Sequence, residues 1–204
     1  MLKLSIRSIV FCLSVIGISS CKTDGKRATV QAPDISGYLV SLCKISEEAD
    51  GYAKTWRDLS SSDANVKSNE AKVRKAYVAI QGQHRAIIEA MAVGIESMQL
   101  KGPDFKIALP DRVFDISKEL KNLEVYHIEF HESVFSSISN ADTPVPFSNL
   151  KAFTSSILSI FQDLMSFVNA KKIAEAERRK ILMEKAVSIR KHCPVPSWDA
   201  AVKK

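Results

Sequence analysis

The residues best suited to chemistry are the histidines and carboxylates of the segment His127-Ile128-Glu129-Phe130-His131-Glu132. Residues four apart share one face of a helix, so His127 and His131 could together bind a divalent metal ion. A zinc-protease helix requires Glu directly after the first histidine, where this chain has Ile128, and the only candidate for a third ligand is the distant His84. Because His127 also falls on an apolar stripe, the better prediction is a packed, hydrogen-bonded core histidine. No metal or other cofactor is expected.

Motifs for other kinds of reaction do not occur in the sequence. There is no Gly-rich phosphate loop, no nucleophile elbow and no CxxC pair. Serines with no base at a fixed spacing are predicted to be polar helix residues; examples are Ser133, Ser136, Ser137 and Ser139. The sequence therefore predicts a protein that is not an enzyme.

The first twenty residues differ from the rest of the chain. Lys3 and Arg7 are their only charged residues, and an apolar run from Ile9 to Ile18 follows. A helix that spans a membrane needs about 20 apolar residues, and this run is near half of that. The pattern is that of a secretory signal peptide over residues 1–20, with an uncleaved anchor as the alternative.

The residues Ile18-Ser19-Ser20-Cys21 resemble the lipobox of bacterial lipoproteins, in which one aliphatic and two small residues precede a cysteine. This resemblance covers only the N-terminal segment. It implies that cleavage leaves Cys21 at the N-terminus, where thiol and amino group carry acyl chains such as palmitate, each buried methylene contributing about 0.8 kcal/mol to anchoring. In that family Asp after the cysteine favours the inner membrane, so Lys22 implies the outer membrane, facing the periplasm. The alternative is a simple secretory signal with a coincidental cysteine.

Processing would change both the cysteine count and the charge. Cleavage removes Cys12 and acylation uses Cys21, so Cys43 and Cys193 remain and are predicted to form one disulfide in an oxidising envelope. The alternative is two unrelated buried cysteines. The signal carries two basic residues and no acidic one, so the mature chain has 27 Lys and Arg against 23 Asp and Glu. That net charge of +4 is compatible with anionic headgroups and gives no argument for nucleic-acid binding.

Apolar residues three and four positions apart, in long stretches without proline, predict four helices. We expect them over about 34–59, 73–98, 111–138 and 148–189, with Asp34 as the first N-cap and polar connections over 60–68 and 140–146. The fourth helix would be some 65 Å long, so we expect it to bend, break or project, with its weakest point near Asn169 to Lys172.

The predicted class is all-α, a mostly antiparallel four-helix bundle in up-down-up-down order. Residues 21–33 would be the lipidated tether and linker, 34–198 the bundle and 199–204 a C-terminal tail. In this topology the start of the first helix and the end of the fourth share one pole, as a Cys43–Cys193 bridge requires. The sequence makes no prediction about the oligomeric state.

Two segments are candidates for contact with a partner or with lipid. The end of the fourth helix is basic and could meet lipid headgroups or an acidic protein, or be a solvated face with pairs such as Glu175 and Arg179. Its candidate residues are Arg178, Arg179, Arg190 and Lys191. The alternating segment from Phe105 to Leu109 could dock a partner as a strand through Phe105 and Ile107, or could tuck under the bundle.

These observations lead to one functional hypothesis and one alternative. The hypothesis is a membrane-anchored, non-enzymatic lipoprotein of the bacterial cell envelope that binds another envelope protein as an inhibitor, immunity factor or assembly accessory. The alternative is a sensor that binds a small ligand or a metal in the bundle interior, near His84, His127 and His131.

Overall fold

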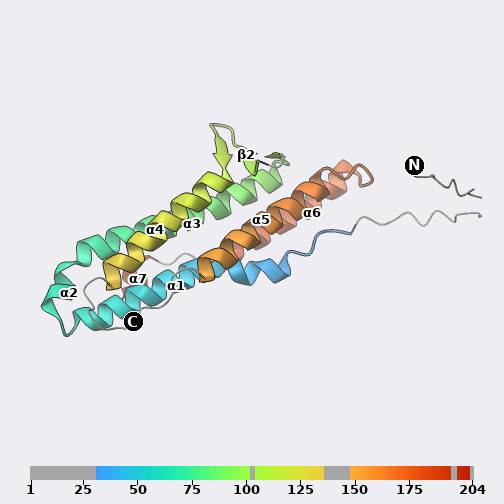
Figure 1. Ribbon diagram of the computed structural model, residues 1–204. Coiled ribbons are helices and arrows are strands. Elements are labelled where there is room, and N and C mark those ends of the chain that lie inside the picture. Colours follow the sequence, from blue (N-terminus) through green and yellow to red (C-terminus); the bar gives the residue numbers. More distant parts are fainter. Residues whose placement is uncertain (1–30, 102–103, 136–147, 194–196, 203–204) are drawn as a thin grey trace, which may run out of the picture.

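The computed structural model describes residues 31–101, 104–135, 148–193 and 197–202 (Figure 1). Seven helices make up 78% of these residues, so the protein is mostly helical, as predicted. The helices are α1 Ser36–Ser60, α2 Ala64–Ser68, α3 Glu70–Glu96, α4 Ile116–Phe135, α5 Ser148–Val168, α6 Glu175–His192 and α7 Trp198–Val202. Three short strands, β1 Leu100–Lys101, β2 Lys106–Ala108 and β3 Val113–Asp115, lie between α3 and α4.

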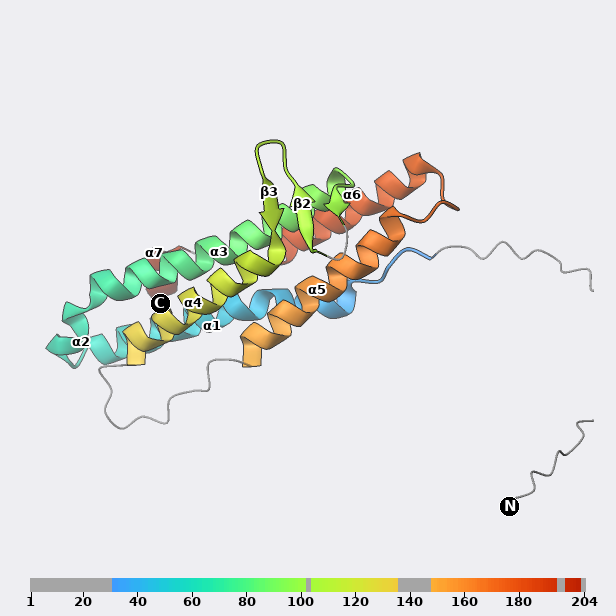
Figure 2. The same ribbon diagram turned by 45° about the horizontal axis from the view of Figure 1, so that its top comes forward.

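The long helices α1, α3, α4, α5 and α6 run roughly along one common direction (Figures 1 and 2). α3 makes its largest contacts with α4 and α6, and α1 makes its largest contact with α5. The described chain begins at the end of this array where α5 turns into α6, which we call the turn end. The opposite end, where α2 lies, is the α2 end.

The fourth helix differs from the expectation of one long rod. α5 ends at Val168 and α6 begins at Glu175, so the single helix over 148–189 is wrong, although the break lies where the sequence predicted a weak point. The N–H of Asn169 donates to the carbonyl of Met165 at 3.1 Å and closes the last turn of α5. The apolar stripe is interrupted at Lys171 and Lys172, and α6 turns back to pack on α3, which buries its own apolar residues.

The connection between α1 and α3 contains a helix that was expected to be a polar loop. Asp63 caps α2, because its Oδ1 accepts the N–H of Asn65 at 2.7 Å and that of Val66 at 3.4 Å. Val66 is buried, and its carbonyl accepts the indole N–H of Trp56 at 3.3 Å. The α2 end is therefore held by specific contacts.

The third helix begins later than predicted, because the residues before it form a small sheet. β2 pairs antiparallel with β1 and β3, and Ile107 lies opposite Phe114. The N–H of Leu109 donates to the carbonyl of Arg112 at 2.8 Å and closes the hairpin. Asp115 Oδ1 accepts the N–H of Lys118 at 3.0 Å, which starts α4 at its first turn.

The hairpin rests on α3 at a glycine. A Cβ added to Gly94 would lie 2.7 Å from Cγ2 of Ile107, which is fully buried, whereas a Cβ at Gly82 on the same helix would meet nothing within 4 Å. Gly94 thus permits the close approach of the sheet to α3.

Gly94→Val should lower the free energy of unfolding by about 1–3 kcal/mol, because the added methyl groups must displace Ile107 in a filled core. Gly82→Val is the matched control and should be neutral or slightly stabilising, because valine is a better helix former than glycine and the space is open. Urea denaturation of both variants checks this expectation. Equal losses of stability would contradict the role given to Gly94.

Residues 199–202 of the expected C-terminal tail belong to a helix, α7, which begins at Trp198 at the end of the expected bundle. Trp198 and Ala201 of α7 are buried. The ring of Trp198 lies 5.4 Å from the ring of Trp56 and 5.4 Å from that of Tyr77. α7 therefore covers the seam between α1 and α3 and belongs to the core.

Candidate functional site

The disulfide between Cys43 and Cys193 is present, as predicted. It joins α1 to the residue that follows α6, with the two Cα atoms 5.1 Å apart and a sequence separation of 150. Both cysteines are buried. The bridge is therefore part of the core of the helical array and encloses most of it.

The interior between α1 and α4 holds a hydrogen-bonded group of ionisable residues. His127, which is 1% exposed, donates from Nε2 to Oε2 of Glu48 at 3.0 Å, and the hydroxyl of Tyr52 donates to the other oxygen at 2.8 Å. Burial by itself acts to raise the pKa of Glu48, but the hydrogen bonds from His127 and Tyr52 outweigh it and leave that pKa lowered. Burial and the bond to Glu48 raise the pKa of Tyr52 above its usual range.

His84 lies in a different part of the core. Its Nε2 donates to the carbonyl of Leu42 at 2.6 Å, and its ring is 5.1 Å from that of Phe153. Burial lowers the pKa of His84, so the ring is held neutral. Each of the three candidate metal ligands thus has other contacts, since His131 packs against the rings of Tyr52 and Phe135.

The structure does not bring these histidines together as a metal site. Within the described ranges, no three His, Cys, Asp or Glu side chains lie close enough to hold an ion. The prediction of a packed, hydrogen-bonded His127 describes the geometry observed. Glu48 was not identified from the sequence, although its place four residues before Tyr52, on the same side of the helix, was a usable signal.

A second polar group connects α1 to α3. Ser46 donates to Oε1 of Gln81 at 2.9 Å, and Asp50 Oδ1 accepts from the hydroxyl of Tyr77 at 2.7 Å and from Nε2 of Gln81 at 3.3 Å. Burial raises the pKa of Asp50 in spite of these bonds. Tyr77 and Gln81 are also the floor of a surface hollow, so the network fixes the side chains beneath that surface.

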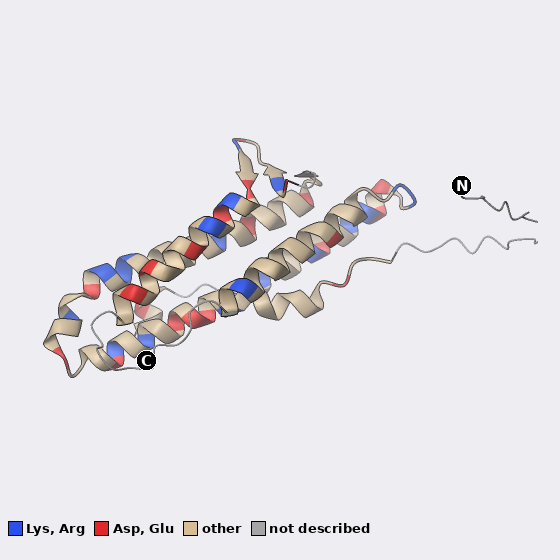
Figure 3. Ribbon diagram, viewed as in Figure 1, with Lys and Arg blue, Asp and Glu red and all other residues tan. Residues whose placement is uncertain are grey.

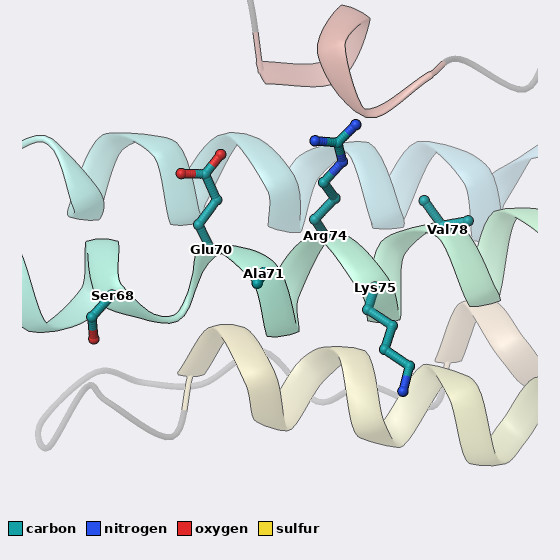
Figure 4. Close-up of a pocket in the computed structure, with 6 residues that line it drawn as sticks. All are labelled: Ser68, Glu70, Ala71, Arg74, Lys75 and Val78. Carbon is teal, nitrogen blue, oxygen red and sulfur yellow. The ribbon is translucent and has the colours of Figure 1, made fainter.

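The surface above this network is a pair of adjoining hollows along α3. The first, near the α2 end, has a volume of about 640 Å³ and is lined by Ser68, Glu70, Ala71, Arg74, Lys75 and Val78. Figure 4 shows Glu70 and Arg74 extending to one side of α3 and Lys75 to the other. The second, between α3 and α7, has a volume of about 410 Å³ and adds Gly82, Arg85, Trp198 and Asp199. We call these residues together the α3 surface.

The α3 surface combines exposed apolar area with basic charge. Val78 is 57% exposed and lies between the two hollows. Arg74, Lys75 and Arg85 are exposed and form no ion pair with any residue that the structure describes. Figure 3 shows basic residues gathered along the first half of α3. The sequence analysis did not identify these four residues as a site. The surface is completed by Trp198, which comes from a distant segment, so no local pattern indicates it.

A further hollow of about 550 Å³ lies between α4 and α5 and is more apolar. Leu120, Leu150 and Leu158 line it, with Lys121, Glu124 and Lys151 around them. Its α5 side is formed by the first half of that helix, from Leu150 to Leu158.

The predicted contact residues have different surroundings. Ile107 is fully buried, and the ring of Phe105 lies 5.3 Å from the ring of Phe161. The alternating segment is therefore packed against the protein. The prediction that Ile107 contacts a partner is wrong, because its side chain is not accessible. Cys21 lies outside the described residues. Among those residues, no helix is both long enough and apolar enough to span a bilayer.

The basic residues of α6 are partly used within the chain. Arg190 binds Glu89 at 3.0 Å and forms a two-armed pair with Glu96, so it clamps α6 to α3. Arg178 donates to the carbonyl of Ala170 at 2.8 Å, and Arg179 lies 3.6 Å from Glu175. Lys191 is exposed and remains open to contact from outside.

Comparison with known proteins gives no relative from which a role could be transferred. No family model, no curated protein and no solved structure matches the chain significantly.

Proposed function

We propose that this chain is a lipid-anchored, non-enzymatic lipoprotein of the bacterial cell envelope that binds an acidic surface of another envelope protein, as an inhibitor, an immunity factor or an assembly accessory. The observation that carries the proposal is the α3 surface, where the exposed Val78 lies among Arg74, Lys75 and Arg85, which have no ion-pair partner in the described part of the chain. A patch with an exposed apolar residue at its centre and more basic than acidic side chains around it, here three against Glu70 and Asp199, is typical of a protein-binding surface.

The position of the α3 surface agrees with a tether at the other end. The described chain begins at the turn end, and the first hollow lies near α2 (Figure 1). Acylated Cys21 and the residues up to Pro33 would hold the turn end toward the outer membrane, at a reach of about 40 Å when extended. The α3 surface would then lie near the end of the domain that is farther from the tether, where a periplasmic partner could reach it.

The bundle arrangement is part of the same proposal. We infer an antiparallel up-and-down order for α1, α3, α4, α5 and α6, which puts the tether and the partner surface at opposite ends. The polar network of Ser46, Asp50, Tyr77 and Gln81 supports a rigid α3 surface, because its hydrogen bonds fix α3 against α1. A rigid surface loses little conformational entropy on binding.

A second candidate is a sensor of a small ligand or a metal. One observation favours it: the Nδ1 atoms of His84 and His127 are buried and have no hydrogen-bond partner among the described residues. A ligand that enters the bundle interior could use them. The hollows described above open at the surface, which favours the protein partner.

The test is a pull-down of the full chain from its own envelope, with mass spectrometry of its N-terminus and of the bound proteins. We expect acylated Cys21 and one stoichiometric partner. The double variant Arg74→Glu/Arg85→Glu should lower the affinity for that partner by at least about tenfold, because reversed charges repel an acidic surface.

The matched control is Lys54→Glu/Lys118→Glu, which makes the same change of charge at exposed positions outside the α3 surface. This control variant should bind the partner as the wild type does. Equal loss in both variants, or retention in both, would contradict the assignment of the α3 surface. A bait without acyl chains would contradict the tether, and binding of zinc or a metabolite that depends on His84 would favour the sensor.

A further inference from the structure

The outer face of α6 carries an exposed stripe with a regular composition. Residues at spacings of four and three lie on one side of this helix, all of them exposed; they are Ala176, Lys180, Met183, Val187 and Lys191. Met183 is 51% exposed and Val187 is 41% exposed. The opposite side of the helix is buried through Leu182, Ala186 and Ile189, so α6 has a second apolar strip that the described chain does not cover. We call the exposed stripe the outer α6 face.

Basic residues outnumber acidic ones around this face, although Glu177 and Glu184 are also exposed beside it. Lys180 and Lys191 flank the two apolar residues, and Lys171 and Lys172 are exposed in the turn just before the helix. These four lysines form no ion pair with the described residues, in contrast to Arg179 and Arg190. A face with apolar residues between lysines fits the boundary between lipid headgroups and acyl chains.

The start of the described chain lies beside the end of α5, which leads into the turn before α6. Gln31, Pro33 and Asp34 form a hollow together with Asp163, Ser166 and Phe167 near the end of α5. The hydroxyl of Tyr38 donates to Asp163 Oδ2 at 3.3 Å, which fixes the start of α1 at the same place. A tether that leaves the domain at residue 31 would therefore pull the α5–α6 turn, and α6 with it, toward the membrane (Figure 2).

We infer that the outer α6 face lies on an anionic bilayer, with Met183 and Val187 at the headgroup boundary and the lysines on the headgroups. Each lysine near an anionic surface strengthens membrane binding by about fivefold. Four lysines alone therefore give weak membrane binding. A lipid tether that keeps them close to the bilayer makes that binding firmer. The strength of this membrane contact depends on the proposed tether, whereas its location depends on the exposed residues of α6. It assigns the domain one orientation on the membrane.

The experiment uses the mature chain without its acylated residue, from residue 22, since the buried core and the disulfide lie wholly within the described residues. Sedimentation with vesicles of equal parts phosphatidylglycerol and phosphatidylcholine is compared with vesicles of phosphatidylcholine alone. We expect binding at least about tenfold tighter to the anionic vesicles, weakened by added salt. Lys180→Glu/Lys191→Glu should abolish that preference, and Met183→Ser/Val187→Ser should reduce binding at constant charge.

The control is Lys118→Glu/Lys121→Glu, which makes the same change of charge at exposed positions of α4, outside the outer α6 face and the α3 surface, and should leave vesicle binding unchanged. Equal binding to both vesicle types, or equal loss in the two charge-reversal variants, would overturn the inference. The inference would also be overturned if light scattering without vesicles shows a dimer and Met183→Ser/Val187→Ser makes it dissociate. A second copy of the chain would then cover the outer α6 face. These outcomes are separate from the proposed function, whose failure shows in the N-terminal mass or in the partner pull-down.

Discussion

Reduction of the Cys43–Cys193 disulfide should lower the free energy of unfolding by about 5 kcal/mol. The bridge closes a loop of 150 residues, and the conformational entropy that it removes from the unfolded chain rises with the logarithm of the loop length. Guanidinium denaturation with and without a reductant measures this difference. The figure is a large part of the stability of a typical domain, so the reduced protein should be close to unfolding at 37 °C.

The double variant Cys43→Ala/Cys193→Ala is the control for this prediction. It should match the reduced wild type, and reductant should not change its midpoint. A difference below about 1 kcal/mol between the oxidised and reduced forms would mean that the unfolded chain gains little freedom when the bridge opens.

Replacement of Glu48 by leucine should cost about 2–4 kcal/mol of stability. It leaves the buried Nε2 of His127 and the hydroxyl of Tyr52 without their common acceptor, and an unsatisfied buried donor is costly. The matched control is Glu47→Leu, at the exposed neighbouring position, which should change stability by about 0.5 kcal/mol or less.

The pairing can be separated from the burial of each residue by a double-mutant cycle. The costs of Glu48→Leu and His127→Leu should be far from additive, because each variant removes the same bond. Additive costs would contradict a coupled group.

The same variants should change how stability depends on pH. The lowered pKa of Glu48 means that its contribution is complete above its ordinary value of about 4.5 and is lost as the pH falls through the folded-state value. Glu48→Leu should flatten that acidic part of the profile. Burial lowers the pKa of His84, so protonation of the unfolded chain below about 6.5 also destabilises the fold, and this earlier loss should persist in Glu48→Leu.

The sequence predicted the features that local pattern and cysteine counting control. Asp34 was expected to be the N-cap of the first helix; the N-cap is Ile35 instead, and Asp34, one residue earlier, accepts the N–H of Ser36 on its Oδ1 at 2.9 Å. The break near residues 169–172 followed from a thin apolar stripe and an improbable helix length. The disulfide followed from the cysteines that remain once Cys12 and Cys21 are set aside.

The features that the sequence missed depend on contacts between distant segments. Strands of two and three residues are too short for an alternation to be recognised, and β2 is defined by its partners and by Gly94. The acceptors of Arg190, Glu89 and Glu96, lie seven residues apart on α3, but nothing local indicates that α6 packs there. The α3 surface likewise needs α7, which local pattern placed in a tail.

The long separation of Cys43 from Cys193 also sets the order of events as the protein is made. Most of α1 and all of α2 to α6 lie between the two cysteines, so Cys43 must wait as a free thiol until that whole length has been synthesised. Formation of the Cys43–Cys193 disulfide therefore requires that the chain has been synthesised as far as Cys193. A chain interrupted before Cys193 would keep a free thiol, lack the stabilisation that the bridge supplies and be more readily degraded by proteases.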